Sequence, residues 1–228
     1  MTPADWEVIR LSLKVALVAV ATVLPVAFAL AYLLARGRFP GRILLDAIVH
    51  LPLVLPPVVT GWLLLIAFGR TGPIGGWLDR WLGITLMFRW TGAAVAAGVM
   101  ALPLMVRAIR LSIEAVDRRL EGAARTLGAG PVRTFLTITL PLSLSGVLAG
   151  LVLGFARSIG EFGATISFVS NIPGQTRTLP IAIYTALQVP GEEGQVVRLA
   201  LVSVALSLGA LVLSELLVRR QGARAHVL

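Results

Sequence analysis

Long apolar runs are the feature of this sequence that most restricts how the chain can fold. The first of them, residues 8–34, carries only two charged side chains, Arg10 and Lys14, and exceeds the roughly 20 residues that an α-helix needs to cross a bilayer. Hydrophobic residues make up 57% of the 228 residues, against about 45–50% in soluble domains. The sequence therefore predicts an all-α, polytopic membrane protein with a single domain over residues 1–228. The five predicted membrane spans cover about 8–34, 51–68, 90–109, 141–159 and 197–218.

Prolines and glycines predict where these helices depart from regular geometry. Pro25 predicts a kink in the first span. Three prolines within residues 51–57 exclude a regular α-helix in the first turns of the second span, and such broken backbone is tolerated at membrane depth where protein or a cavity surrounds it. We expect residues 69–89 to form a loop. Residues 166–189 contain prolines, glycines and Arg177, which favour a partly re-entrant outer segment over a sixth span.

Basic residues lie mainly between the apolar runs. The formal net charge is +9, and this distribution is typical of a membrane-orientation signal rather than of nucleic-acid binding. With five spans and these basic segments on the inside, we expect residues 36–50, 107–140 and the C-terminal tail to be cytoplasmic and the N-terminus to be outside. The basic residues in these three segments are Arg36, Arg38, Arg42, Arg107, Arg110, Arg118, Arg119, Arg125, Arg133, Arg219, Arg220 and Arg224.

The sequence contains few of the residues that enzymatic chemistry needs. There is no cysteine, and the two histidines are too few for a histidine metal cluster within one chain. The aspartates lie in predicted loops or at the edges of spans, which argues against an intramembrane enzyme. We therefore assign no catalytic residue and no metal site. The chain also lacks the Gly-x-x-x-x-Gly-Lys-Ser/Thr loop that binds nucleotide phosphates.

One long polar, basic segment, residues 117–141, separates the third and fourth spans. Its apolar residues fall at helical spacing and predict a short amphipathic helix over 120–127, with Asp117 as its N-cap. Gly128 is expected to end this helix in a left-handed turn, and Pro131 suits the first position of a second short helix. The segment is therefore predicted to form a helix–turn–helix.

This segment resembles the cytoplasmic coupling loop of binding-protein-dependent ABC importer permeases. The pattern of that family is Glu-Ala-Ala, three residues, Gly, nine residues, and Ile-x-Leu-Pro, and it is matched in register by Ala123-Ala124, Gly128 and residues 138–141. The glutamate position holds Gly122, and Glu121 lies one residue earlier. For Glu121, an intrahelical ion pair with Arg125 is the alternative to a contact with the ATPase. The resemblance assigns ATPase coupling to Glu121, Gly122, Ala123, Ala124, Arg125, Gly128 and Pro131.

Two other segments resemble the oxyanion importers of this family. Residues 50–61 are similar to the second-span signature of molybdate importer permeases, and residues 157–184 are similar to a segment that molybdate and sulfate permeases share. The compact length favours the molybdate group, with tungstate as a possible second substrate and a sulfate or thiosulfate permease as the alternative. A stand-alone secondary transporter or channel is the rival class, but the inverted repeats typical of such proteins are not visible.

The resemblance implies a set of partners and a location. They are a second copy of this chain, two ABC ATPase subunits on the cytoplasmic side, a periplasmic or extracellular oxyanion-binding protein, and the lipid bilayer of a bacterial or archaeal cytoplasmic (inner) membrane.

Polar residues in and beside the spans are candidates for the translocation pathway or its gate. However, Arg157 and Glu161 also have the spacing of a simple ion pair, and span hydroxyls commonly bond to their own helix. The candidate pathway residues are Thr60, Arg157, Glu161, Thr165, Ser167 and Ser170.

Overall fold

The computed structural model describes the backbone of residues 1–225 and the side chains of residues 1–213 and 216. The predicted basic tail, Arg219, Arg220 and Arg224, lies outside the residues whose side chains are described. Within the described backbone, every regular element is helical. The elements are α1 (Pro3–Arg36), α2 (Arg42–Val54), α3 (Pro57–Phe68), α4 (Gly75–Leu82), α5 (Trp90–Ala115), α6 (Arg118–Thr126), α7 (Pro131–Thr134), the π-helix η1 (Phe135–Thr139), α8 (Leu140–Ile159), α9 (Gly163–Val169), α10 (Leu179–Ala186) and α11 (Glu193–Ala225).

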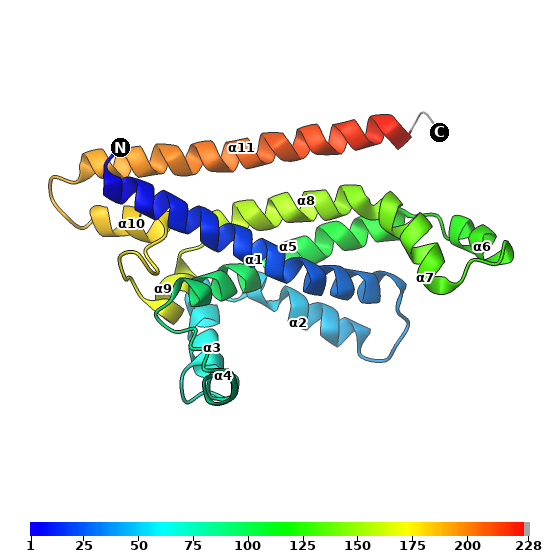
Figure 1. Ribbon diagram of the computed structural model, residues 1–228, viewed down its shortest axis with the longest axis horizontal. Helices are drawn as coiled ribbons and strands as arrows, with labels where there is room; N and C mark the ends of the chain where they lie inside the picture. The colour runs from blue at the N-terminus through cyan, green and yellow to red at the C-terminus, as the bar shows by residue number, and fades with distance from the viewer. Residues whose placement is uncertain (226–228) are drawn as a thin grey trace.

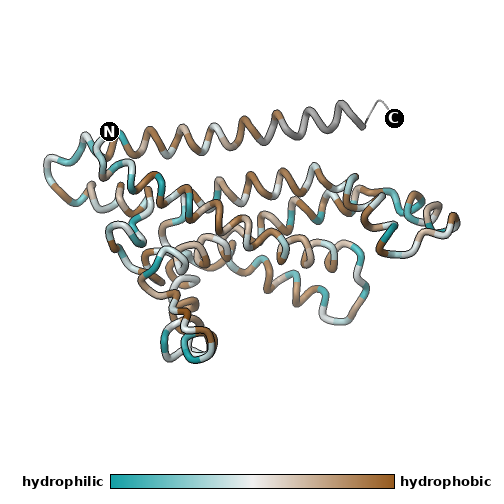
Figure 2. Tube along the Cα trace, in the orientation of Figure 1, coloured by the Kyte–Doolittle hydropathy of each residue, from teal (hydrophilic) through white to brown (hydrophobic). Residues whose placement is uncertain are grey.

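Four long helical segments of the described chain are apolar enough to cross a membrane. They are α1, α5, the continuous run Pro131–Ile159 and the part of α11 over Glu193–Leu213, and the bent pair of α2 and α3 gives a fifth. Figure 1 shows α1, α5, α8 and α11 along the long axis of the molecule, with α6 and α7 at one end and α9 and α10 at the other. Hydrophobic residues predominate along α1, α5 and α8 (Figure 2). The all-α fold with five spans is confirmed when the bent pair is counted as one span.

The boundaries predicted for the second span are wrong. The helix begins at Arg42, inside the predicted cytoplasmic loop, and continues through Pro52. It breaks only at Leu55 and Pro56, after which α3 turns away by 116°. One proline costs a helix a single backbone hydrogen bond, whereas the Pro56-Pro57 pair removes two donors and forces the preceding residue out of helical geometry. Leu55 accordingly has a ψ of 142°.

Two segments predicted to lack long helices contain short ones. Residues 69–89 include α4, which ends at Gly83 in the left-handed conformation with a φ of +63°; this helix was not predicted. Residues 163–186 form α9 and α10, neither of which is long enough to cross a membrane. The prediction of a re-entrant segment in place of a sixth span is therefore consistent with the structure. The backbone N–H of Leu179 donates to Ser12 Oγ at 2.7 Å, which holds the start of α10 against α1.

The two ends of α11 differ in how they are held. Near its start, Arg198 Nε donates to Asp5 Oδ2 at 3.2 Å and Gln195 Nε2 donates to Asp5 Oδ1 at 3.3 Å. Asp5 is fully buried at the N-terminus of α1, where Thr2 caps the helix. Most large apolar side chains described further along α11 are exposed. The polar attachment of the described part of α11 is therefore at its first turns.

Small residues allow α8 to approach α5 closely. A Cβ atom added at Gly146 would overlap Ser112 and lie 2.8 Å from the carbonyl oxygen of Ala108. One added at Gly154 would lie 2.7 Å from Met105 Sδ. Close backbone contact at small residues is the usual way in which membrane helices gain packing energy, because lipid tails are as apolar as the helices themselves. The contact between α5 and α8 thus depends on Gly146 having no side chain.

We expect Gly146→Val to destabilise the protein by about 1–3 kcal/mol, the usual cost of overpacking a well-packed contact. The measurement is the thermal unfolding midpoint of the purified chain in detergent. Gly209→Val on α11 is the matched control, because a side chain there meets nothing within 4 Å. An unchanged midpoint for Gly146→Val would contradict the close packing of α5 on α8.

Candidate functional site

The predicted helix–turn–helix is present as α6 and α7, and residues 117–141 are called the hairpin below. Asp117 caps α6, because its carboxylate accepts a hydrogen bond from the Arg119 N–H at 2.9 Å. The helix starts at residue 118, two residues earlier than the apolar spacing suggested. A residue that caps a helix is followed directly by its first helical residue, so the N-cap was the better guide to the boundary than the hydrophobic pattern.

The turn between the two helices also forms as predicted. Gly128 has a φ of +86°, the left-handed region that disfavours residues with a side chain. This conformation brings the Ala129 N–H within 3.0 Å of the Ala124 carbonyl oxygen and closes the end of α6. Pro131 then occupies the first turn of α7. The local sequence alone therefore specifies the shape of the hairpin.

The outer surface of the hairpin is open. Leu127 is 88% exposed and Val132 is 69% exposed, although both are apolar. A Cβ atom added at Gly122 or Gly130 would meet nothing within 4 Å, so contacts within this chain do not require either residue to be small. Such a surface is what another protein approaching closely would need. Among the predicted coupling residues, Gly122, Ala123, Arg125, Gly128 and Pro131 are exposed, whereas Glu121 and Ala124 are half-buried.

Glu121 is oriented toward its own chain. Its Oε1 atom accepts a hydrogen bond from Arg36 Nη2 at 2.9 Å and another from Thr139 Oγ1 at 2.8 Å. Arg36 ends α1 and also donates to the carbonyl oxygen of Val116 at 3.2 Å. The intrahelical pair with Arg125 is therefore not the ion pair that the structure forms. A contact of Glu121 with an ATPase stays a prediction.

Aromatic packing adds a second attachment between the hairpin and α1. The ring of Phe135 lies edge-on to Tyr32 and Phe28, with centroid distances of 5.3 and 5.8 Å. Phe135 begins η1, which runs into α8 without a break. The hairpin is thus fixed to α1 by Arg36 and Phe135 and is continuous with α8. Neither Arg36 nor Phe135 was singled out for this role from the sequence.

Two helix breaks lie together at the other candidate site. A Cβ atom added at Gly61 in α3 would lie 2.5 Å from the carbonyl oxygen of Ala164 in α9. One added at Gly163 would lie 2.7 Å from Pro57 Cβ. The break between α2 and α3 is therefore packed directly against the break between α8 and α9, as broken backbone at membrane depth requires.

An ion pair occupies this junction. Arg157 Nη1 lies 2.6 Å from Glu161 Oε2, which confirms the pairing that their spacing predicted. The other carboxylate oxygen accepts from the Ala164 N–H at 2.8 Å and so satisfies the first turn of α9. Glu161 is 2% exposed, and its charge is held by these two contacts. Whether Arg157 also guides an anion stays a prediction.

The four predicted pathway hydroxyls are not gathered in one open channel. Thr60 and Thr165 are buried, and Thr60 Oγ1 has no hydrogen-bond partner among the described side chains. Ser167 Oγ donates to the carbonyl oxygen of Gly163 at 2.8 Å, the helix-internal bond considered as the alternative. Ser170 is exposed and has a φ of +64°. Thr60 is therefore the predicted pathway hydroxyl that the structure leaves unpaired at the junction.

The profile of one protein family covers most of the chain. The family is described as the binding-protein-dependent transport system inner membrane component, and its profile matches residues 24–222. The chain belongs to this family. A curated relative, the molybdenum transport system permease protein ModB of Escherichia coli (strain K12), is 57% identical over 225 residues, covering 99% of this chain and 98% of that protein. The ModB protein of Haemophilus influenzae is 58% identical and covers 95% of this chain and 94% of its own length.

A solved structure supports the fold of this inner membrane component. The crystal structure of a bacterial alginate ABC transporter, in complex with an alginate-pentasaccharide-bound periplasmic protein, contains a chain that matches with a TM-score of 0.75. The match covers 96% of this chain and 80% of the other at 16% sequence identity. At that identity the likeness shows a shared fold, that of an ABC importer membrane subunit.

We expect Arg36→Met and Glu121→Gln to weaken the attachment of the hairpin of this inner membrane component. A double-mutant cycle should give a coupling energy of about 0.5–3 kcal/mol, the range for residues in direct contact. The measured quantity is the local opening free energy of α6 from amide hydrogen exchange. A cycle of Glu121→Gln with Arg125→Met is the control and should show almost no coupling. Stronger coupling to Arg125 than to Arg36 would contradict the observed pairing.

Proposed function

We propose that this chain is the membrane-spanning permease subunit of an ATP-driven importer that carries molybdate into the cell by alternating access. The observation that supports this most directly is the 57% identity to the Escherichia coli ModB protein over nearly the full length of both chains. The aligned region of 225 residues contains the spans, the helix breaks and the hairpin. Tungstate, a dianion of the same shape, would use the same route.

The hairpin supplies the physical basis for coupling to an ATPase. Its exposed glycines leave open space that contacts within the chain do not require, which supports a partner surface. Because Arg36 and Phe135 attach the hairpin to α1 and η1 continues into α8, a displacement of α6 and α7 would move both long helices. ATP and Mg²⁺ would act in two ATPase subunits at this end, and the bundle would respond as rigid bodies.

The exposed apolar surface supports a second copy of the chain in the assembly. Helix α3 is apolar around its circumference apart from Thr60, yet Val58, Trp62 and Ile66 are each about half exposed. Helices that are apolar on every side are normally buried. In the proposed assembly, α3 and its counterpart close the outer side of the pathway, and an external oxyanion-binding protein delivers the anion there. The N-terminus would then face outward from a bacterial or archaeal cytoplasmic membrane.

Two alternatives were raised by the sequence. A sulfate or thiosulfate permease shares the 157–184 segment, but the relatives described above are named for molybdenum transport. A stand-alone secondary transporter or channel would give no reason for the open glycines of the hairpin. Molybdate import with a separate ATPase is therefore the function that we propose.

The test is uptake of radioactive molybdate by proteoliposomes that contain this chain, its ATPase and its external binding protein. We expect uptake that requires ATP and is not suppressed by excess sulfate. Gly122→Leu should insert and fold normally, because an added Cβ atom there would meet nothing within 4 Å, but should reduce both ATPase association and uptake at least tenfold.

Gly209→Leu is the matched control for this assay, since it places the same side chain in open space away from the hairpin. It should leave uptake unchanged. Molybdate uptake at the normal rate by Gly122→Leu would contradict the coupling role of the hairpin. Uptake of sulfate in preference to molybdate would contradict the proposed substrate.

A further inference from the structure

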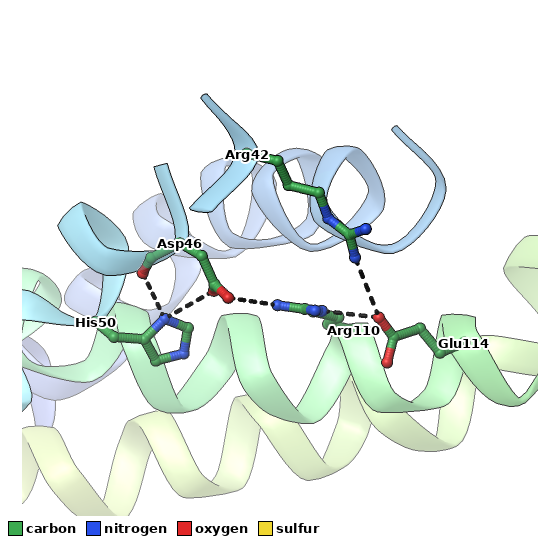
Figure 3. A network of polar contacts seen from close by, with 5 residues as sticks. All are labelled: Arg42, Asp46, His50, Arg110 and Glu114. Atoms are coloured by element: carbon green, nitrogen blue, oxygen red, sulfur yellow. Dashed lines mark hydrogen bonds and ion pairs between the residues drawn. The ribbon is translucent and has the colours of Figure 1, made fainter. Parts of the chain in front are cut away.

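A ladder of charged side chains joins α2 to α5. Figure 3 shows Arg42, Asp46 and His50 of α2 facing Arg110 and Glu114 of α5. Arg110 lies between the two carboxylates, with Nη1 3.0 Å from Asp46 Oδ2 and Nε 2.8 Å from Glu114 Oε1. Arg42 Nη2 lies 3.9 Å from the same oxygen of Glu114. His50 Nδ1 is 2.9 Å from the backbone carbonyl oxygen of Asp46 and 3.2 Å from Asp46 Oδ1. This ladder is the main polar attachment of α2, whose only fully buried residue is Val49.

A cavity of about 290 Å³ opens beside the ladder. Arg107 is exposed at this cavity and forms no ion pair within the part of the chain whose side chains are described. Around the cavity and ladder, three arginines face two carboxylates, which leaves one positive charge in excess among these five groups. The residues that line the cavity are Asp46, His50, Arg107, Arg110, Leu111 and Glu114.

The cavity lies between the helix breaks and the hairpin. His50 precedes the break at Leu55 by five residues, which is about 7.5 Å along an α-helix. At the other end, Glu114 is followed after two residues by Asp117, the cap of α6. An anion that leaves the junction of the broken helices toward the hairpin end would therefore encounter this cavity next.

The charge balance of the cavity favours transient binding of an anion. Arginines in or beside membrane-spanning helices usually serve a transport path or a partner charge. Guanidinium groups match the oxygens of a tetrahedral anion through paired N–H donors. The nearby carboxylates of Asp46 and Glu114 repel the same anion and compete for Arg110. Conduction requires binding of this intermediate strength, strong enough for entry and weak enough for release.

We propose that the cavity between α2 and α5 is an intermediate binding site for a tetrahedral oxyanion on its way to the hairpin side of the membrane, with Arg107 and Arg110 as its ligands. This inference rests on the proposed function, because it assumes that the anion passes along α2. The site recognises charge and tetrahedral shape, so sulfate and molybdate both occupy it.

The test uses the absence of cysteine from the chain. Leu111→Cys places a single thiol at the lip of the cavity, where Leu111 is 59% exposed. The rate at which an uncharged maleimide modifies this thiol is measured by mass spectrometry of this subunit, in the permease–ATPase complex in a maltoside detergent. Separate arms contain molybdate, sulfate, phosphatidylglycerol, or chloride at matched ionic strength.

We expect molybdate and sulfate to slow the modification at least threefold relative to chloride. Adding Arg107→Gln should abolish the protection, and Arg107→Lys should retain part of it. Arg38→Gln removes the same charge from the exposed loop after α1 and should leave the protection intact. Elution of each variant as an assembled complex establishes that it is folded.

Three results would overturn the proposal: no protection by molybdate, protection that survives Arg107→Gln, or protection by phosphatidylglycerol alone. The last would make the cavity a lipid headgroup site. The measurement involves no transport, so its failure is separable from failure of the proposed function. Normal molybdate uptake without protection at Leu111→Cys would contradict this site only.

Discussion

The bond network of Glu121 is the interaction on which the rest of the structure depends. One carboxylate oxygen accepts hydrogen bonds from Arg36 at the end of α1 and from Thr139 at the start of the α8 run. The hairpin has no other charged attachment among the described side chains, and α6 buries none of its residues. Without this network, α6 would be held to the bundle only through its neighbours in the chain and through the Phe135 contacts with α1. With it, the hairpin and two membrane-spanning helices form one mechanical unit.

At the end of the bundle opposite the hairpin, the helices are broken rather than continuous. The helices break at Leu55–Pro56 and before Gly163, and irregular backbone of this kind is tolerated within a membrane only where protein covers it or a cavity adjoins it. Packing α3 on α9 through Gly61, together with the capping of α9 by Glu161, covers this irregular backbone. A regular helix bundle would be simpler to stabilise, so the breaks are consistent with a role in opening and closing a path. The ladder between α2 and α5 lies between the breaks and the hairpin.

Local chemistry made some of these features predictable and others not. Asp117, Gly128 and Pro131 follow capping and turn rules that depend only on their neighbours in the chain, and all three were predicted. The pairing of Arg36 with Glu121 joins residues that are 85 positions apart, and no local rule identifies it. The start of the second span was predicted too late in the chain because Pro52 was treated as a helix breaker like Pro56 and Pro57. In the structure, α2 continues through Pro52. The cavity beside Arg107 could not be predicted, because it forms only when α2 packs against α5.

We propose that a separate ATPase contacts the hairpin on the cytoplasmic side. The most direct measurement is a crosslink from Ala123→Cys, an exposed position in a chain without cysteine, with a short thiol-to-amine reagent in the assembled complex in membranes. The account predicts a product that contains this chain and the ATPase, and no modification of Ala123→Cys by an impermeant thiol reagent added outside intact cells. Modification from outside, without a crosslink to the ATPase, would contradict it.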